Sequence, residues 1–314
     1  MFRFVNLFTL FLSFFAAGIR VQAAELEVVT YNTALARALG RDFNPCVRER
    51  TEAILDNVLK KSDVPTIFLF QEVFYQDAYK GLERWSYENG FNVTETDSSR
   101  NGLVIVTDLP IQTDFLRRYS CGRFMQNPGV LTARIGNDKF SFDVMSTHTN
   151  DSDGNAPDKC QMIQLKELAG HFNNRKGTVI MGGDINAGPD LKILKQKYDP
   201  IQKIWEPFRN LIVDGSRAPT ETKGVTWDIE NNFLARGGHI PKEQVEGPQD
   251  NSTLDHLFFK GDVELIDYAI VYNRPVPVRN CSDFETESGK THMSDHFGVR
   301  ARINLKNISS FSDL

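Results

Sequence analysis

The chain carries the segment Gly182-Gly183-Asp184-Ile185-Asn186 between the apolar run Thr178 to Met181 and the turn-forming Ala187-Gly188-Pro189. The apolar run predicts a buried strand, so the polar side chains are expected where that strand meets a loop. Asp184 and Asn186 are two residues apart, and both side chains face the same way if strand geometry continues through them. Because Gly, Asp and Asn are also common in turns, the motif needs support from the rest of the chain.

Polar or ionisable residues follow other predicted strands as well. Asn32 follows the segment Leu26 to Tyr31, and Gln71-Glu72 follows the run Thr66 to Phe70, whose apolar character predicts a strand buried on both faces. The strand-end groups on which the functional prediction rests are Asn32, Glu72, His148, Asp184, Asn186, Asp255, Asp295 and His296. A random distribution of polar residues would rarely produce this pattern.

Hydrolysis of a phosphate ester would use these groups. It needs a hard divalent cation, which takes oxygen ligands from carboxylates and carboxamides, and Glu72 and Asn32 fit that need. It also needs a base that activates water. His296 is the candidate base, because an imidazole suits neutral pH once a carboxylate fixes its tautomer.

Each group also has an ordinary interpretation that the sequence leaves open. Glu72 could be a first-turn acid of a following helix. Asn32 could be a turn residue, His148 a half-exposed strand histidine and Asp255 a turn cap. His256 is expected to face the opposite side of its strand from the site.

The succession of elements predicts an α/β fold. Strands are predicted at residues 26–31, 66–70, 102–106, 111–119, 129–135, 140–147, 178–181, 254–259, 264–272 and 297–303, and helices at 47–60 and 159–172. Runs of strands with few helices favour an antiparallel meander over strict β-α-β winding. We therefore expect two mostly antiparallel sheets packed face to face, with helices outside.

The N-terminal segment predicts a secretory signal peptide over residues 1–23, because Arg3 precedes an apolar run and small residues end the segment at Ala23. Residues 24–314 are expected to form one secreted catalytic domain, periplasmic or extracellular, since no linker divides them and no later segment is apolar enough to cross a bilayer. The net charge of -5 argues against a surface that binds nucleic acid throughout, while a local basic patch stays open.

The chain has four cysteines, Cys46, Cys121, Cys160 and Cys281, which in an exported protein predict two disulfides with three pairings open. None lies in a C-x-x-C pair, which argues against a zinc cluster. The G-x-S-x-G, H-E-x-x-H, Walker A and G-x-G-x-x-G motifs are absent from the sequence. A glycosidase with two carboxylates stays open, but it would leave the amides and histidines unused.

Taken in order, these motifs resemble the endonuclease/exonuclease/phosphatase superfamily along nearly all of residues 24–314. The matching motifs are Asn32, Gln71-Glu72, Thr147-His148, Gly183-Asp184-Ile185-Asn186, Leu254-Asp255-His256 and Ser294-Asp295-His296. Within the superfamily the chain looks most like the secreted neutral sphingomyelinases. This narrower resemblance rests on Ser120-Cys121-Gly122, Lys159-Cys160 with Gln164-Leu165-Lys166-Glu167, and Thr226-Trp227-Asp228 followed by Asn231-Asn232.

The resemblance implies a DNase I-like, four-layer α/β sandwich with the site in a cleft at one edge of the sheets. Glu72 would bind the catalytic Mg²⁺ with Asn32 nearby, and Mn²⁺ or Co²⁺ could replace Mg²⁺. His296 would be the general base, oriented by Asp255.

The same resemblance implies roles for the other polar groups. Asp184 and Asn186 would hold the attacked phosphate or its water. His148 would contact a phosphate oxygen or assist the leaving group, and Asp295 would support the metal and water network. The resemblance also implies a disulfide between Cys121 and Cys160, which leaves Cys46 with Cys281.

The leading hypothesis is hydrolysis of sphingomyelin at a membrane surface to ceramide and phosphocholine. The resemblance implies an aromatic-rich hairpin before the final Asp-His, whereas residues 280–293 are polar and contain Phe284 as their only aromatic residue. A DNase I-like nuclease that cleaves DNA or RNA is the alternative, and a catalytically silent binding module is a third hypothesis. A monomer with no protein partner is expected.

Overall fold

The structure is a computed structural model that describes residues 24–38, 41–42, 44–95, 101–122, 128–138, 140–150, 159–186, 225–236, 251–281 and 290–306. The predicted signal peptide lies outside the described residues. So does most of the polar stretch before the final Asp-His, including Phe284. No helix in the described part of the chain is long and apolar enough to span a bilayer.

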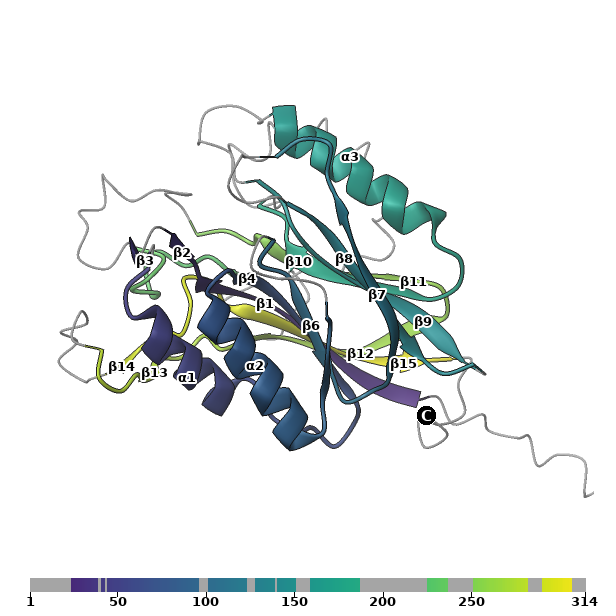
Figure 1. Cartoon of the computed structure of the whole chain (residues 1–314). Helices are drawn as coiled ribbons and strands as arrows, with labels where there is room; N and C mark the ends of the chain where they lie inside the picture. The colour runs from purple at the N-terminus through teal and green to yellow at the C-terminus, as the bar shows by residue number, and fades with distance from the viewer. Residues whose placement is uncertain are drawn as a thin grey trace, which may run out of the picture.

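The first sheet has six strands in the order β12-β15-β1-β4-β6-β5. Their bounds are β1 Ala24–Leu35, β4 Thr66–Val73, β5 Asn92–Val93, β6 Val104–Thr107, β12 Val263–Val271 and β15 Gly298–Leu305. Strand β1 is parallel to β4 and antiparallel to β15. Helices α1, Val47–Asn57, and α2, Gln76–Asn89, cover this sheet, as Figure 1 shows.

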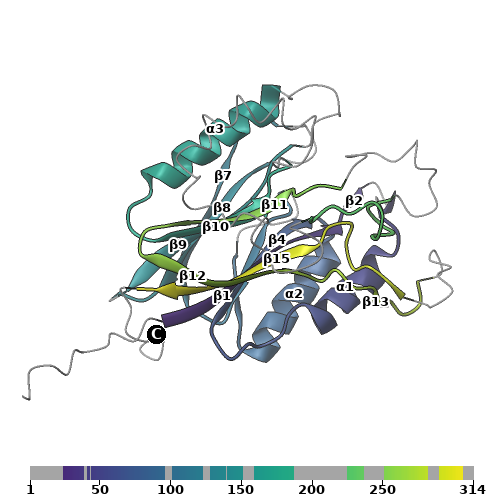
Figure 2. The same cartoon turned by 180° about the vertical axis from the view of Figure 1, so that it is seen from behind.

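The second sheet has five strands in the order β11-β10-β9-β8-β7. Their bounds are β7 Ile111–Arg118, β8 Gly129–Gly136, β9 Ser141–His148, β10 Val179–Asp184 and β11 Asp255–Lys260. Helix α3, Lys159–Asn174, covers its outer face, which is also visible from behind in Figure 2. Two short ribbons complete the described elements: β2 Arg37–Ala38 with β3 Arg41–Asp42, and β13 Val276–Pro277 with β14 Lys290–Thr291.

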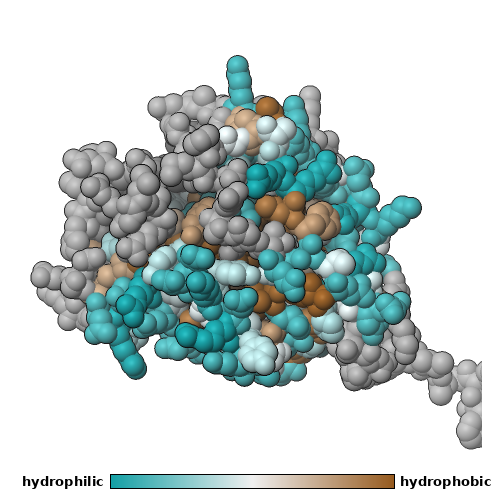
Figure 3. Space-filling model, viewed as in Figure 1, coloured by the Kyte–Doolittle hydropathy of each residue, from teal (hydrophilic) through white to brown (hydrophobic). Residues whose placement is uncertain are grey.

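Side-chain alternation in the strands builds the layers. In β4, Ile67 and Leu69 enter the core between the sheets, whereas Phe68 and Phe70 enter the core under α1 and α2. A third apolar core joins the five-stranded sheet to α3. The predicted burial of this strand on both faces is confirmed, and so is the four-layer α/β sandwich. Figure 3 shows that the surface on the side of α1 and α2 is mostly hydrophilic, with smaller hydrophobic areas.

The structure differs from the sequence prediction in two respects. First, the pairs β1–β4 and β9–β10 are parallel, and α1 and α3 form their crossovers, so two β-α-β units interrupt the expected meander. Second, α2 was not predicted. Its buried positions Ala78, Gly81, Leu82 and Ser86 have helical spacing, but Leu82 is the only large apolar residue among them, and the partly buried Tyr79 and Trp85 supply the other contacts with the core.

Both predicted disulfides are present. Cys121 is bonded to Cys160 at the start of α3, and Cys46 before α1 is bonded to Cys281 after β13. The second bond joins parts of the chain that are 235 positions apart.

Candidate active site

Two glycines allow close packing at the end of β10. A Cβ atom on Gly183 would lie 2.0 Å from the carbonyl oxygen of Thr147 in β9, and one on Gly182 would lie 2.7 Å from Leu69 Cδ1 in the other sheet. A larger residue at either position would push β10 away from its neighbours. The two glycines therefore let Asp184, the last residue of β10, approach the strand ends of the six-stranded sheet.

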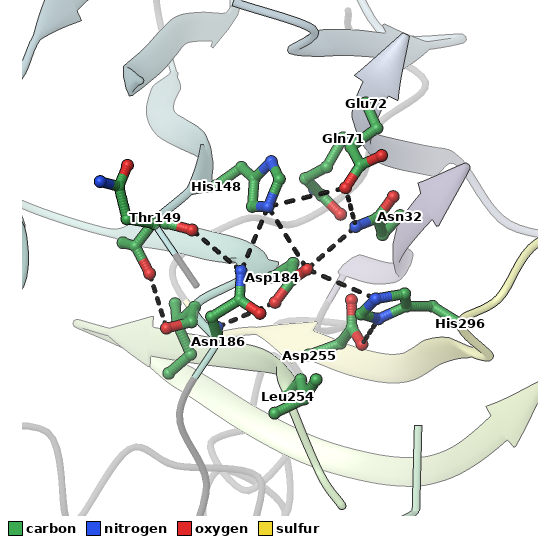
Figure 4. Close-up of polar contacts among 12 residues, drawn as sticks. Asn32, Gln71, Glu72, His148, Thr149, Asp184, Asn186, Leu254, Asp255 and His296 are labelled. Atoms are coloured by element: carbon green, nitrogen blue, oxygen red, sulfur yellow. Dashed lines mark hydrogen bonds and ion pairs between the residues drawn. The ribbon is translucent and has the colours of Figure 1, made fainter. Parts of the chain in front are cut away.

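Asp184 is the centre of the polar cluster. Its Oδ2 accepts a hydrogen bond from Asn32 Nδ2 at 2.9 Å and lies 3.5 Å from His148 Nε2 and 3.6 Å from His296 Nε2. Its Oδ1 accepts the backbone N–H of Asn186 at 2.8 Å. Figure 4 shows these side chains converging on Asp184 from strands and from the loops beside them. The structure thus brings together residues that are far apart in the sequence.

Asn186 reaches the cluster through a turn, not through strand alternation. Strand β10 ends at Asp184, and Asn186 has a left-handed backbone with φ of 48°. Its Nδ2 lies 3.2 Å from His148 Nε2 and donates to the carbonyl of Thr149 at 2.9 Å. Strand geometry does not continue to Asn186, so the condition for both side chains to face the same way is not met; the Asp184 side chain closes an Asx turn that redirects the amide.

Glu72 joins the cluster from β4, also with a left-handed backbone. Its φ is 58°, and Ala34 has φ of 50° where the register of β1 and β4 shifts. Such a conformation costs a non-glycine residue about 1–2 kcal/mol. Glu72 Oε1 accepts a hydrogen bond from Asn32 Nδ2 at 3.0 Å and lies 3.8 Å from His148 Nε2. Because Glu72 lies within β4 and α2 begins at Gln76, it is not a first-turn helix acid.

Asn32 bridges the two carboxylates through its amide nitrogen. The same Nδ2 donates to Glu72 and to Asp184, while Oδ1 accepts the backbone N–H of Ala34 at 3.0 Å. The oxygen therefore faces away from the cluster. In this arrangement Asn32 holds the carboxylates in place and offers no oxygen ligand to a cation.

His296 is paired with the buried Asp255. Its Nδ1 lies 2.8 Å from Asp255 Oδ2, which directs Nε2 toward Asp184. Burial disfavours the charged ring, but the carboxylates of Asp255 and Asp184 outweigh burial and raise the pKa of His296 well above its usual value. His256, the next residue in β11, stacks on Phe258 at 5.8 Å, and Phe258 belongs to the core under α3. His256 thus lies on the opposite face, as expected.

The cluster has the donor set that a divalent cation requires. Ligand atoms of Glu72, His148 and Asp184 all lie within 4.8 Å of one another. Burial raises the pKa of Glu72 and the charge of Asp295 adds to the effect, although His148 favours the ionised form. Two carboxylates held this close, one of them disfavoured in its charged form, fit a hard cation that would compensate their charge.

Asp295 lies beside the cluster without a direct hydrogen bond to Glu72 or Asp184 among the described contacts. Its Oδ2 accepts from Asn44 Nδ2 at 3.2 Å, and its Oδ1 accepts from Ser294 Oγ at 3.2 Å. The negative charge of Asp295 raises the pKa of Glu72 by electrostatic repulsion. The sequence prediction did not identify Asn44 as its partner.

Arg50 is a further residue that the sequence prediction missed. Its side chain is fully buried, and it donates to the carbonyl oxygens of Thr33 at 3.2 Å, Ala34 at 2.7 Å, Pro45 at 2.9 Å and Met293 at 2.9 Å. It therefore ties the segment after Asn32 to the loop that carries His296. A charged residue on a predicted amphipathic helix normally indicates a solvated face, so its position gave no signal.

The segment 225–236 supports His296 from the other side. The Trp227 ring packs edge-on against the His296 ring, with centroids 5.1 Å apart. Thr226 Oγ1 accepts the backbone N–H of Asp255 at 3.2 Å, and Asn232 Nδ2 donates to the carbonyl of Ser294 at 2.9 Å. The predicted motif around Trp227 thus contacts the histidine and its aspartate.

The profile of the Endonuclease/Exonuclease/phosphatase family matches residues 29–296. The chain belongs to this family. Enzymes of the family are hydrolases of phosphate esters that use divalent metal ions. A sequence comparison with curated proteins gives no match.

Solved structures of other proteins share the fold of this chain. A mutant beta toxin from Staphylococcus aureus with bound magnesium ions is 20% identical, with a TM-score of 0.62 over 88% of this chain and 98% of that chain. Sphingomyelinase C from Streptomyces griseocarneus is 16% identical, with a TM-score of 0.60 over 89% and 99%. TDP2 from D. rerio, complexed with single strand DNA product, is 14% identical, with a TM-score of 0.62 over 89% and 99%.

Proposed function

We propose that this protein is a secreted, Mg²⁺-dependent phosphodiesterase that hydrolyses sphingomyelin to phosphocholine and ceramide. The convergence of His296, with Asp255 behind it, on the carboxylate of Asp184 carries the proposal. A buried imidazole that is held by one carboxylate and faces another is the arrangement that general-base activation of water requires.

In the proposed mechanism, His296 Nε2 takes a proton from water while the bond to Asp255 stabilises the imidazolium. Asp184 Oδ2, 3.6 Å from that nitrogen, accepts the second hydrogen of the water and orients it for in-line attack on phosphorus. The new phosphorus–oxygen bond forms as the bond to the leaving oxygen breaks, this oxygen takes up a proton from solvent, and His296 then releases the proton that it took from water. The side chains of His148 and Asn186 donate to the phosphoryl oxygens, where negative charge develops.

Glu72 and Asp184 would hold the cation with their carboxylate oxygens. When bound, the ion supplies positive charge to the phosphoryl group during hydrolysis. We propose Mg²⁺ because carboxylate oxygens are the hard ligands that it prefers, and Mn²⁺ or Co²⁺ could replace it. Asn32 keeps the two carboxylates in position through its hydrogen bonds to both.

Sphingomyelin is the proposed substrate because the sequence motifs that resemble those of secreted neutral sphingomyelinases have structural roles in the fold. Trp227 packs on His296, and Cys121 is bonded to Cys160. The fold is shared with sphingomyelinase C. Two disulfides in the described chain also favour an oxidising compartment, in agreement with the signal peptide proposed for residues 1–23.

A nuclease is the second candidate, because TDP2 with its DNA product shares the fold to the same extent. One assay distinguishes the two candidates. The purified protein, with Mg²⁺ or with EDTA, is given sphingomyelin liposomes and plasmid DNA in parallel. Release of phosphocholine only with Mg²⁺ is the expected result, whereas nicked DNA beside intact liposomes would identify a nuclease.

A further inference from the structure

The apolar core between the two sheets ends in a polar layer next to the catalytic cluster. The facing sides of β1, β4 and β9 supply apolar residues to this core along most of their length. Toward the cluster, each of these strands instead carries a fully buried polar side chain: Thr30, Gln71 and Ser146. The mechanism above uses none of the three.

Gln71 and Ser146 join the two sheets by hydrogen bonds. Gln71 Nε2 in β4 donates to Ser146 Oγ in β9 at 3.1 Å, and Ser146 Oγ donates to the carbonyl of Phe70 in β4 at 3.4 Å. Gln71 Nε2 also donates to the carbonyl of Leu69 at 2.9 Å, and Thr30 Oγ1 lies 3.2 Å from this nitrogen. The buried amide therefore finds partners in both sheets, as a buried polar group requires.

The strands carry this cross-sheet contact to the catalytic cluster. In the parallel pair β9–β10, His148 lies opposite Asp184, two residues beyond Ser146. In the other sheet, Glu72 directly follows Gln71. The contact thus lies two residues along β9, about 7 Å, below the point where Glu72 Oε1 is 3.8 Å from His148 Nε2.

Close packing and hydrogen bonding restrain different motions at this level. Packing limits how near the sheets come, because a Cβ atom on Gly182 in β10 would lie 3.0 Å from Thr30 Cβ in β1. Apolar contacts are non-directional, so they oppose sliding of one sheet along the other only weakly. A hydrogen bond weakens steeply when its length or angle changes, and the bond between Gln71 and Ser146 therefore opposes this sliding.

We propose that the Gln71–Ser146 pair positions the carboxylates of Glu72 and Asp184 for the divalent cation. Both members act through the residues that follow them on their strands, so they are positioning residues that touch no substrate. The proposal rests on the cation site of the proposed function, and it holds for any phosphodiester that the site hydrolyses.

Calorimetric titration with Mn²⁺, the proposed substitute for Mg²⁺, tests the pair without any substrate. Ser146→Ala and Gln71→Met each break the cross-sheet bond, and each should weaken Mn²⁺ binding by about 10–100-fold, the usual effect of losing a group that orients metal ligands. The double variant should bind no more weakly than Gln71→Met alone, because both changes break the same contact. Losses that multiply in the double variant would show two independent effects and overturn the proposal.

Two control variants separate positioning from a loss of stability. Ser86→Ala makes the same substitution at a fully buried site in α2, away from the space between the sheets. Val106→Ala removes two methyl groups from the core under α1 and α2, and it should lower the urea midpoint at least as much as Ser146→Ala does. Both controls should bind Mn²⁺ within about twofold of wild type, since distant sites act independently.

Two results would contradict the cross-sheet role. Equal Mn²⁺ affinity in Ser146→Ala and Ser86→Ala would remove it outright. Weaker binding in Gln71→Met alone would assign the effect to the bonds of Gln71 inside its own sheet. Circular dichroism checks that each variant folds, and if Gln71→Met does not, the smaller change in Ser146→Ala decides.

A measurement in EDTA distinguishes failure of this proposal from failure of the proposed function. The ring proton resonances of His148 at a fixed pH report its surroundings, which include Glu72 from the other sheet. Gln71→Met and Ser146→Ala should both shift these resonances, and Val106→Ala should not. A wild-type protein that binds no Mn²⁺ would contradict the proposed metal-dependent function. Unshifted His148 resonances in both pair variants would overturn the positioning role whether or not Mn²⁺ binds.

Discussion

Asp184 Oδ2 lies 3.6 Å from His296 Nε2, although Asp184 ends a strand of the five-stranded sheet and His296 precedes a strand of the six-stranded sheet. The site therefore exists only when the two sheets are packed together. Its geometry depends on residues that set their separation and hold the connecting loops.

Replacement of His296 by Ala should lower the turnover of sphingomyelin by about 10²–10⁴-fold, the usual contribution of a general base. Phosphocholine release under saturating substrate measures the effect. His171→Ala is the control, because this histidine lies in the last turn of α3, away from the cluster, and should change turnover little. Turnover of the His296 variant within tenfold of wild type would remove the histidine from the role of base.

The metal-free protein should become less stable as the pH rises above about 6.5, the pKa of an unperturbed histidine. The pKa of His296 is raised in the folded state, so folding takes up a proton in this range. The free energy of unfolding then decreases by up to about 1.4 kcal/mol per pH unit until the folded pKa is passed. Urea denaturation in EDTA at a series of pH values measures the slope.

The other titratable groups with shifted pKa values near this range do not cancel the loss of stability above pH 6.5. Burial lowers the pKa of His171 and of His292, so their contribution to stability increases with pH and is complete near pH 6.5. The raised pKa of Glu72 acts in the same direction as that of His296 but begins near pH 4.5. His296→Asn should flatten the slope above pH 6.5, and an unaltered slope would show that another group causes it.

Arg50→Lys should destabilise the protein by about 2–4 kcal/mol, because an ammonium group cannot reach carbonyl oxygens on four sides as the planar guanidinium does. We expect turnover to fall as well, since Arg50 connects the Asn32 segment with the His296 loop. Chemical denaturation and kcat measure the two effects. Arg48→Lys, on the exposed side of the same helix, should change neither.

Gly183→Ala should destabilise the protein by about 3 kcal/mol, because the added methyl group would meet the carbonyl of Thr147 at 2.0 Å. Gly170→Ala is a matched control in α3, where a Cβ atom meets nothing within 4 Å. It should stabilise the protein by about 0.5–1 kcal/mol through helix propensity. Thermal unfolding measures both, and equal midpoints for the two variants would contradict the steric argument.

The sequence predicted the layers and the identity of the polar cluster because strand-end residues follow strongly apolar runs. It could not predict the left-handed backbone at Glu72 and Asn186, which sets the direction of both side chains. It also missed Arg50, since burial of a helix arginine depends on carbonyl groups that distant loops supply. Helix α2 was not predicted because three of its four buried positions are the small residues Ala78, Gly81 and Ser86, and its other core contacts include the partly exposed Tyr79 and Trp85.

The bond between Cys46 and Cys281 encloses most of the chain in one covalent ring. A protease that cuts once anywhere inside this ring produces two pieces that stay linked through the disulfide. Only a reducing agent would then let the pieces separate. If the protein is secreted, as proposed, a single protease cut in a surface loop inside the ring would not by itself release any part of the catalytic cluster.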